Sequence, residues 1–193
     1  GKRRKVTVRR VSIPDGNGST EAFFKLYHHR PGGWRFWLRS SKVRCEFENY
    51  ATFDRLGVPA AQAIACGEDR DALGRLHRNF IITRAVPDAV PLDQFIVSCP
   101  SWSERRHLTV ELARILRRLH AANFFYHDLV WRNILVSRSA KDGRRLFLID
   151  CPRGRTARLG RTTKRLRDLA SLDKTAAQRC SRVRSWRRSD HAG

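Results

Sequence analysis

The 193-residue sequence has no methionine, and its five cysteines are widely spaced. Because even an initiator methionine is missing, we expect the sequence to be a fragment or to have a trimmed start. The odd number of cysteines and the lack of a C-x-x-C pair argue against a disulfide framework and against a zinc site. This pattern predicts reduced thiols in a cytosolic protein. The cysteines are Cys45, Cys66, Cys99, Cys151 and Cys180.

Long apolar runs are also missing. No stretch approaches the roughly 20 apolar residues that a membrane-spanning helix needs. The basic residues 1–5 are not followed by the apolar segment that a secretory signal peptide requires. The sequence therefore predicts neither a membrane span nor a signal peptide.

Acidic residues are scarce, because 18 Asp and Glu stand against 40 Lys and Arg, giving a formal net charge of +22. Charge of this sign favours polyanionic partners such as nucleotide phosphates, anionic lipid, phosphorylated glycan or nucleic acid. Few aromatic residues lie among the C-terminal arginines, so specific nucleic-acid binding through base stacking is not expected. Hydrophobic residues make up 41% of the chain and are well dispersed, which indicates a globular protein.

The first half of the chain is predicted to form strands and one helix. Residues 6–13 and 21–27 have the composition of strands and flank a turn of Pro, Asp, Gly and Asn residues, which predicts a hairpin. Residues 41–56 have helical spacing. One face of this helix carries Phe47, Tyr50 and Phe53. Further short strands are predicted within residues 57–68 and 77–86.

The second half is predicted to be mainly helical. A proline-rich connection, residues 86–95, precedes it. Ser101 and Glu104 form a capping-box pattern, and the helix that follows carries an aliphatic stripe. That stripe consists of Leu108, Leu112, Ile115, Leu116 and Leu119. Residues 134–137 and 146–150 predict paired strands around a turn at 141–143, and arginine-rich helices follow, with Asp168 and Leu169 as their most core-like residues.

The order of these elements predicts an α+β fold of two lobes. Residues 1–85 would form a small antiparallel sheet with one helix. Residues 86–193 would form a mainly helical lobe that ends in basic helices.

Three polar residues lie in and beside apolar segments of the second lobe. Asp128 and Asn133 belong to the stretch FFYHDLVWRNILV, and Asp150 ends the apolar strand that follows. This D-x4-N…D order is typical of phosphotransferases. In that chemistry Asp128 orients the acceptor hydroxyl and takes its proton, while Asn133 and Asp150 hold Mg²⁺ through oxygen atoms.

Phosphoryl transfer also needs a cation for the nucleotide phosphates. Lys25 lies on a predicted strand and would contact the α- and β-phosphates of ATP. Glu46, on the following helix, is the expected ionic partner that holds this lysine, and Glu48 is the next candidate. The parts follow one another in the order that the chemistry demands.

Each of these residues also has a structural interpretation. Asp128 and Asn133 could cap a turn, and Lys25 could be a strand lysine whose stem covers apolar surface. Glu46 could be an exposed helix residue paired with Lys42. His127 is expected to be structural, because phosphoryl transfer does not require a histidine base.

Several segments together resemble the bacterial lipopolysaccharide kinase family, whose members are similar to small eukaryotic-type kinases. They are FFKLY, CEFENYATFDRLGVPAAQAIACGE, LHAANFFYHDLVWRNILV and FLIDCPRG. The resemblance covers about residues 6–175. It implies a protein-kinase-like fold, Asp128 as catalytic residue, Asn133 and Asp150 as metal ligands, and Lys25 with Glu46 as the nucleotide-binding pair.

The resemblance has departures. Tyr126 and His127 replace the His and Arg that precede the catalytic aspartate, and a Cys-Pro pair replaces the Phe-Gly that usually follows Asp150. The first strand of the small lobe and most of the glycine-rich loop are not found in the sequence. Gly16 and Gly18 are better assigned to a turn between strands.

The function implied is transfer of a phosphoryl group from ATP, with Mg²⁺, to a Kdo or heptose hydroxyl of the lipopolysaccharide core. The partners implied are ATP, the core glycolipid and an anionic membrane surface. We expect a monomer in the cytoplasm, at the inner face of the membrane. Two alternatives remain: a small atypical Ser/Thr protein kinase, and a non-catalytic basic module on a kinase scaffold that binds nucleic acid or membrane.

Overall fold

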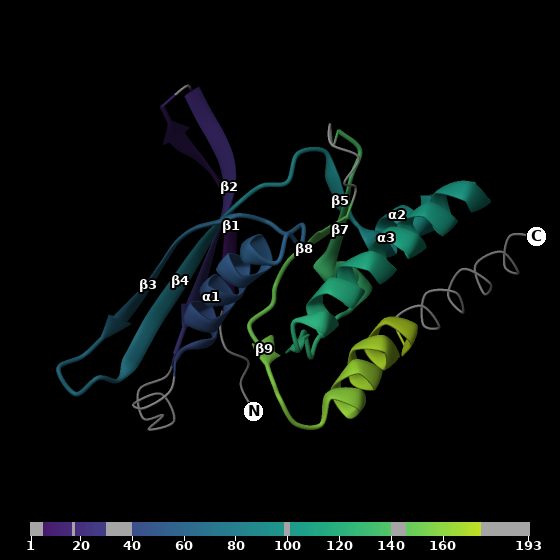
Figure 1. Ribbon diagram of the computed structural model, residues 1–193. Coiled ribbons are helices and arrows are strands. Elements are labelled where there is room, and N and C mark those ends of the chain that lie inside the picture. The colour runs from purple at the N-terminus through teal and green to yellow at the C-terminus, as the bar shows by residue number, and fades with distance from the viewer. Residues whose placement is uncertain (1–5, 17, 30–39, 99–100, 140–145, 175–193) are drawn as a thin grey trace, which may run out of the picture.

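A four-stranded antiparallel sheet forms the N-terminal part of the computed structural model, which describes residues 6–16, 18–29, 40–98, 101–139 and 146–174. The strands are β1 Val6–Asp15, β2 Gly18–His28, β3 Ala63–Arg70 and β4 Leu76–Arg84, in the spatial order β1-β2-β4-β3 (Figure 1). The predicted hairpin is confirmed, with Asp15 opposite Gly18. Gly18 has a φ of 143°, a conformation that needs a glycine. The strand expected within 57–68 begins only at Ala63.

One helix, α1 Lys42–Arg55, packs on β3 and β4. Ser41 caps it, because its hydroxyl oxygen accepts a hydrogen bond from the Arg44 backbone N–H at 3.2 Å. The helix ends before Gly57, whose φ of 61° stops helical propagation. The predicted buried face is confirmed for Tyr50 and Phe53, whereas Phe47 is only partly buried.

The segment expected to be a proline-rich connection contains two short elements. They are strand β5 Ala89–Pro91 and helix α2 Leu92–Ser98. Proline lacks an N–H and has a fixed φ, so Pro91 can end a strand and lead directly into a helix. The prolines therefore mark element boundaries here, and seven helical residues are too few for a periodic pattern to reveal.

Helix α3, Trp102–Ala121, has the predicted cap and stripe. The Ser101 hydroxyl accepts a hydrogen bond from the Glu104 N–H at 3.1 Å. Leu108, Ile115, Leu116 and Leu119 are buried, and Leu112 is partly buried.

Short strands and one 3-10 turn follow α3. They are β6 Phe124–Phe125, η2 Trp131–Asn133, β7 Ile134–Ser137, β8 Leu146–Leu148 and β9 Arg155–Thr156. The predicted pairing of β7 with β8 is confirmed, and β5 pairs with the other edge of β7. The predicted turn at 141–143 lies outside the described residues. The pairing of β6 with β9 was not predicted, since two-residue strands carry no periodic pattern.

A continuous apolar core joins the sheet with α1 to α3 and β8. The Phe53 ring lies edge-on to Phe124, with centroids 5.3 Å apart, and stacks with Tyr126 at 6.1 Å. The Ala61 N–H donates to the Leu148 carbonyl at 3.1 Å, and the Leu148 N–H donates to the Pro59 carbonyl at 3.0 Å. These bonds fix β8, and therefore Asp150 beyond it, against the N-terminal part.

Residues 161–174 form a basic helix that packs beside the end of α3 (Figure 1). The prediction that Asp168 and Leu169 are core-like residues is confirmed for Asp168, which is 1% exposed. It is wrong for Leu169, which is 48% exposed. Cys45, Cys66 and Cys151 are free thiols, while Cys99 and Cys180 lie outside the described residues. Across the described part of the chain, no helix is both long and apolar enough to span a membrane.

Gly154 offers a test of the core next to β6. A Cβ atom at this position would lie 2.4 Å from the Cys151 sulfur and 2.6 Å from the Phe124 ring. We expect Gly154→Ala to lower the free energy of unfolding by about 1–3 kcal/mol through overpacking. Gly16→Ala is the control, because nothing lies within 4 Å of the added methyl group. Equal urea midpoints for the two variants would contradict this packing.

Candidate active site

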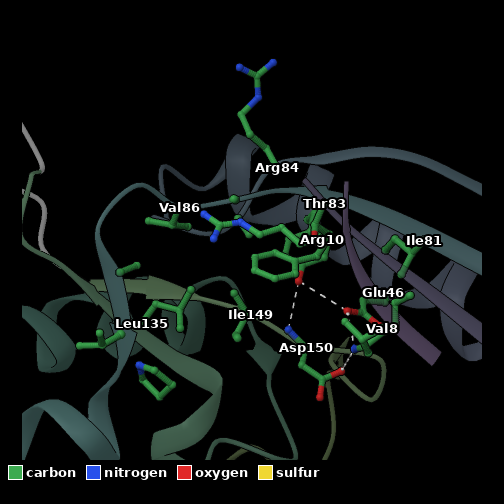
Figure 2. A pocket seen from close by; sticks show the side chains of 18 of the residues that line it. Val8, Arg10, Glu46, Ile81, Thr83, Arg84, Val86, Leu135, Ile149 and Asp150 are labelled. Atoms are coloured by element: carbon green, nitrogen blue, oxygen red, sulfur yellow. Dashed lines mark hydrogen bonds and ion pairs between the residues drawn. The ribbon is translucent and has the colours of Figure 1, made fainter. Parts of the chain in front are cut away.

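A cavity of about 860 Å³ lies between the four-stranded sheet and the β5–β7–β8 sheet (Figure 2). Val8, Phe23 and Ile81 form its sheet side, and Leu135 and Ile149 form the opposite side. The segment from Arg84 to Pro91 closes one end. Lys25, Glu46, Tyr50 and Asp150 form its polar end. The cavity thus joins apolar walls to one cluster of charged side chains.

Lys25 is the centre of that charged cluster. Its ammonium donates a hydrogen bond to Asp150 Oδ1 at 2.8 Å and lies 3.8 Å from Glu46 Oε1. The structure therefore brings the two predicted partners together and adds Asp150. Glu48, the second candidate, is exposed and pairs with Arg44 at 3.1 Å.

Burial controls the charges of this cluster. Burial lowers the pKa of Lys25, but the negative charges of Glu46 and Asp150 outweigh it, so the pKa of Lys25 is raised overall. For Glu46, burial dominates the attraction of Lys25 and raises the pKa of the carboxyl to about 7. Glu46 is 2% exposed, and its Oε2 has no hydrogen-bond partner in the described structure. These facts exclude the exposed-helix interpretation of Glu46.

Tyr50 connects Glu46 to Asp150. Its hydroxyl donates to Glu46 Oε1 at 3.5 Å and accepts a hydrogen bond from the Asp150 N–H at 3.0 Å. We predicted Tyr50 on one helical face with Phe47 and Phe53 and gave it no polar role. Its position four residues after Glu46, on the same helical face, was the signal for a polar role.

The backbone around Asp150 is held by hydrogen bonds from several elements. The Tyr126 hydroxyl donates to the Ile149 carbonyl, and the Ile149 N–H donates to the Asn133 carbonyl at 2.9 Å. The Asn49 amide donates to the Cys151 carbonyl at 2.7 Å. Asp150 itself has a φ of 60°, which an aspartate tolerates better than most residues. These contacts direct the Asp150 carboxylate toward Lys25.

Asp128 and Asn133 lie on the segment between β6 and β7, and this segment contacts the residue before Asp150. Asn133 is 4% exposed, and its Nδ2 donates to the Asp128 carbonyl at 3.1 Å. The half-buried Asp128 carboxylate makes no hydrogen bond to another residue that the structure describes, so it does not cap a turn there. Of the five predicted site residues, Lys25, Glu46 and Asp150 line the cavity. Asp128 and Asn133 are not among its described lining residues. Asn133 contacts the cavity wall through its carbonyl, which accepts a hydrogen bond from the Ile149 N–H.

Asp168 fixes the backbone before Asp128. Its Oδ1 accepts a hydrogen bond from the His127 N–H at 2.8 Å, and its Oδ2 accepts from the Tyr126 N–H at 3.0 Å. His120 Nε2 lies 3.1 Å from the same Oδ2. His127 has a φ of 64°, so the carboxylate stabilises an unfavourable backbone conformation. The sequence indicated that Asp168 is buried but not what it binds.

Residues 25–191 match the model of the lipopolysaccharide kinase (Kdo/WaaP) family. The chain belongs to this family. It is 25% identical to WaaP in a solved complex with acyl carrier protein, with a TM-score of 0.64 over 88% of this chain and 67% of that chain. No curated protein sequence gives a significant match.

A second solved structure also shares the fold of this kinase. A chain of the yeast RNA polymerase II CTD kinase CTDK-1 complex is 15% identical and has a TM-score of 0.54. The match covers 78% of this chain and 44% of the yeast chain, and it shows the fold alone. The predicted two-lobed protein-kinase-like fold, the family and the kinase class are thereby confirmed.

The raised pKa of Glu46 predicts a pH-dependent stability of the kinase. A carboxyl whose pKa rises on folding contributes its full stability below its unfolded pKa, near 4.5, and loses it as the pH rises through about 7. Glu46→Gln removes this titration. From pH 5 to 8, we expect the free energy of unfolding of the variant to gain about 2–3 kcal/mol relative to wild type.

Urea unfolding at several pH values measures this difference. Glu48→Gln is the matched control, because Glu48 is exposed on the same helix. A Glu46→Gln difference that does not change with pH would show that the buried carboxyl does not titrate in this range.

Asp168→Asn tests the anchoring of the segment before Asp128. The amide group keeps one acceptor oxygen and turns an N–H₂ toward at least one buried donor, at about 1–3 kcal/mol for each donor left unpaired. We expect faster hydrogen exchange at the Tyr126 and His127 amides and a lower melting temperature. Asp173→Asn, at an exposed site on the same helix, is the control. Unchanged exchange at both amides would contradict the anchoring role.

Proposed function

We propose that this kinase transfers the γ-phosphoryl group of ATP to a sugar hydroxyl, on Kdo or heptose, of the lipopolysaccharide inner core. One observation carries the proposal: the Lys25 ammonium lies between two carboxylates at the polar end of a cavity with apolar walls. Membership of the lipopolysaccharide kinase family gives the acceptor class. The residue roles below are part of the proposal.

Lys25 would bind the nucleotide phosphates, and Glu46 would keep it in place. The lysine is 2.8 Å from Asp150 and 3.8 Å from Glu46. If Asp150 binds a metal cation in place of Lys25, Glu46 remains as the anion beside Lys25. Tyr50 then links the two carboxylate positions, because its hydroxyl contacts Glu46 Oε1 and the Asp150 N–H.

The donor set fits Mg²⁺. Asp150 offers a carboxylate, and Asn133 offers an amide oxygen, since its Nδ2 is already bonded to the Asp128 carbonyl. The described residues contain no group of three His, Cys, Asp or Glu that could hold a metal alone. Mg²⁺ typically binds one or two protein oxygens and takes further ligands from water and phosphates. When bound, it would neutralise charge on the transferred phosphoryl group.

Asp128 would accept the proton of the acceptor hydroxyl. Its carboxylate forms no hydrogen bond within the described structure, so both oxygens are available to an acceptor. Its backbone is fixed from both sides, by Asn133 Nδ2 on the Asp128 carbonyl and by Asp168 on the preceding N–H. A base held in this way loses little entropy when the acceptor hydroxyl binds.

The apolar part of the cavity would hold the adenine ring. Its volume of about 860 Å³ lies in the range of sites for drug-sized ligands, about 300–1,000 Å³. Val8 and Phe23 would lie on one face of the base, and Leu135 and Ile149 on the other. The segment from Arg84 to Pro91 borders this space. We place the boundary between the two lobes in the same segment, at residues 85 and 86.

The proposal extends to the surroundings of the enzyme. A core glycolipid acceptor places the kinase at the inner face of the cytoplasmic membrane, where its net charge of +22 favours anionic lipid. We propose that it acts there as a monomer. A protein Ser/Thr acceptor is the second candidate, favoured by the general protein-kinase fold alone.

Asp128→Ala tests the chemistry. We expect phosphoryl transfer to fall by at least about a thousandfold, because general base catalysis and acceptor orientation are both lost. Mg·ATP affinity and melting temperature should stay close to wild type. Asp150→Ala should instead weaken Mg·ATP binding. Substantial residual turnover in Asp128→Ala would contradict the proposed base.

The assay uses labelled ATP with a panel of de-phosphorylated core oligosaccharides and, separately, a generic Ser/Thr protein substrate. Transfer to an oligosaccharide supports the proposal. Transfer to the protein substrate alone would replace it with the second candidate.

A further inference from the structure

Three cationic side chains gather beside the segment that precedes Asp128, outside the residues that line the nucleotide cavity. They are Arg155, Lys164 and Arg167, and with His127 we call them the loop-side cluster. They come from β9 and from the helix at 161–174, which follow one another in the chain (Figure 1). The proposed function assigns no role to them.

The fold determines where these side chains lie. Arg155 pairs with Phe125 across the β6–β9 ladder, two residues before His127. Asp168 accepts a hydrogen bond from the His127 N–H at 2.8 Å, and Arg167, the residue before it in the helix, lies close enough to His127 for its charge to act on that ring. Lys164 is one helical turn before Asp168, and its ammonium lies 6.0 Å from the Phe125 ring centroid. All three cations therefore approach one short stretch of backbone.

Their charges act on His127. Burial is the first cause of the lowered pKa of His127, and the positive charges of Arg155, Arg167 and Lys164 lower it further, against the opposing charge of Asp168. The Nε2 atom of His127 is buried and has no hydrogen-bond partner among the described residues. The Nε2 atom of His127 is therefore an unused hydrogen-bonding position beside the three cations.

No described acidic side chain forms an ion pair with a cation of the loop-side cluster. Neither Arg155 nor Arg167 forms an ion pair with a residue that the structure describes, and Lys164 bonds only to the Leu159 carbonyl. Asp168 is the acid nearest to Lys164 and Arg167 in the chain, but its contacts are the Tyr126 and His127 N–H groups and His120 Nε2, and it forms no ion pair with these cations. Several arginines of the N-terminal part do pair with acids, as Arg78 does with Asp69 and Arg84 with Asp15. Unpaired cations held close together repel, and a bound anion would relieve that repulsion.

We propose that the loop-side cluster binds an anionic group, a carboxylate or a phosphate, that the acceptor carries next to the hydroxyl to be phosphorylated. This inference rests on the proposed function, which it deepens by giving the acceptor a second, charged attachment point. His127 and Asp128 are consecutive, and consecutive Cα atoms are about 3.8 Å apart. An anion held at the cluster therefore leaves the rest of the same acceptor within reach of the Asp128 carboxylate.

Arginine suits this task. Its planar guanidinium can donate two parallel hydrogen bonds to a carboxylate or a phosphate, which fixes orientation as well as position. Arg155 and Arg167 come from different elements, so they would grip the anion from two directions. The cluster would thus select acidic acceptors and set which hydroxyl faces Asp128.

The test measures acceptor binding to the full chain by calorimetry. Three soluble probes are compared: a de-phosphorylated core oligosaccharide with its sugar carboxylate, the same oligosaccharide with that carboxylate reduced to an alcohol, and a carboxyl-reduced oligosaccharide that carries one phosphate. Preference for the first or the third probe over the second identifies the carboxylate or the phosphate as the anion that is bound.

The variants are Arg155→Gln, Arg167→Gln and the double variant. We expect the affinity for the preferred probe to fall about tenfold for each arginine removed, and the affinity for the neutral probe to stay the same. Mg·ATP affinity should not change. Arg114→Gln is the matched control, because Arg114 is exposed on α3 and makes no described contact to the loop. Melting temperatures confirm that the exposed substitutions leave the fold intact.

Each outcome decides the inference. Equal binding of all three probes by wild type, or unchanged binding by the double variant, would overturn it. So would a loss of binding to anionic phospholipid vesicles without any loss for the soluble probes, since the cluster would then serve the membrane surface. Phosphoryl transfer is measured in parallel: charge-selective binding without transfer refutes the proposed chemistry, whereas transfer with unselective binding refutes only the loop-side cluster.

Discussion

The ion pairs of Lys25 hold the two parts of the active site in one arrangement. A strand of the small sheet supplies the ammonium, α1 supplies Glu46, and the segment after β8 supplies Asp150. Lys25 and Asp150 are 125 residues apart in the chain, yet the nitrogen and oxygen are 2.8 Å apart. Separating these groups would leave an unpaired charge in a partly buried setting, which is costly, so the contacts hold the three elements together.

The three charges of this cluster are not equivalent. Lys25 has two anionic neighbours, so its protonated form is stabilised in spite of burial. Glu46 lies farther from Lys25, at 3.8 Å, and burial makes its ionised form unfavourable near neutral pH despite the Tyr50 hydroxyl contact. Asp150 remains partly exposed toward the cavity. This gradient of exposure leaves Asp150 as the more accessible of the two carboxylates.

A second set of contacts supports the segment that carries Asp128. Asp168 lies 40 residues beyond Asp128 and binds the two amides before it, while Asn133 binds the Asp128 carbonyl. The same helix that provides Asp168 also carries Lys164 and Arg167. One basic helix therefore fixes the backbone before Asp128 and carries two of the cations that lie beside His127.

Local sequence determined the elements whose signals are local. The hairpin of β1 and β2 follows from turn residues, and α1 and α3 follow from serine caps and apolar spacing. The spacing of Asp128, Asn133 and Asp150, together with Lys25 and Glu46, indicated the kinase class because the chemistry fixes these residue types and their order. Tertiary structure alone decided the Lys25–Asp150 pair, the bond between Tyr50 and Asp150, the β6–β9 pairing and the contacts of Asp168. Each of these depends on residues brought together from distant parts of the chain or on elements too short to be periodic, and neither leaves a pattern along a single sequence.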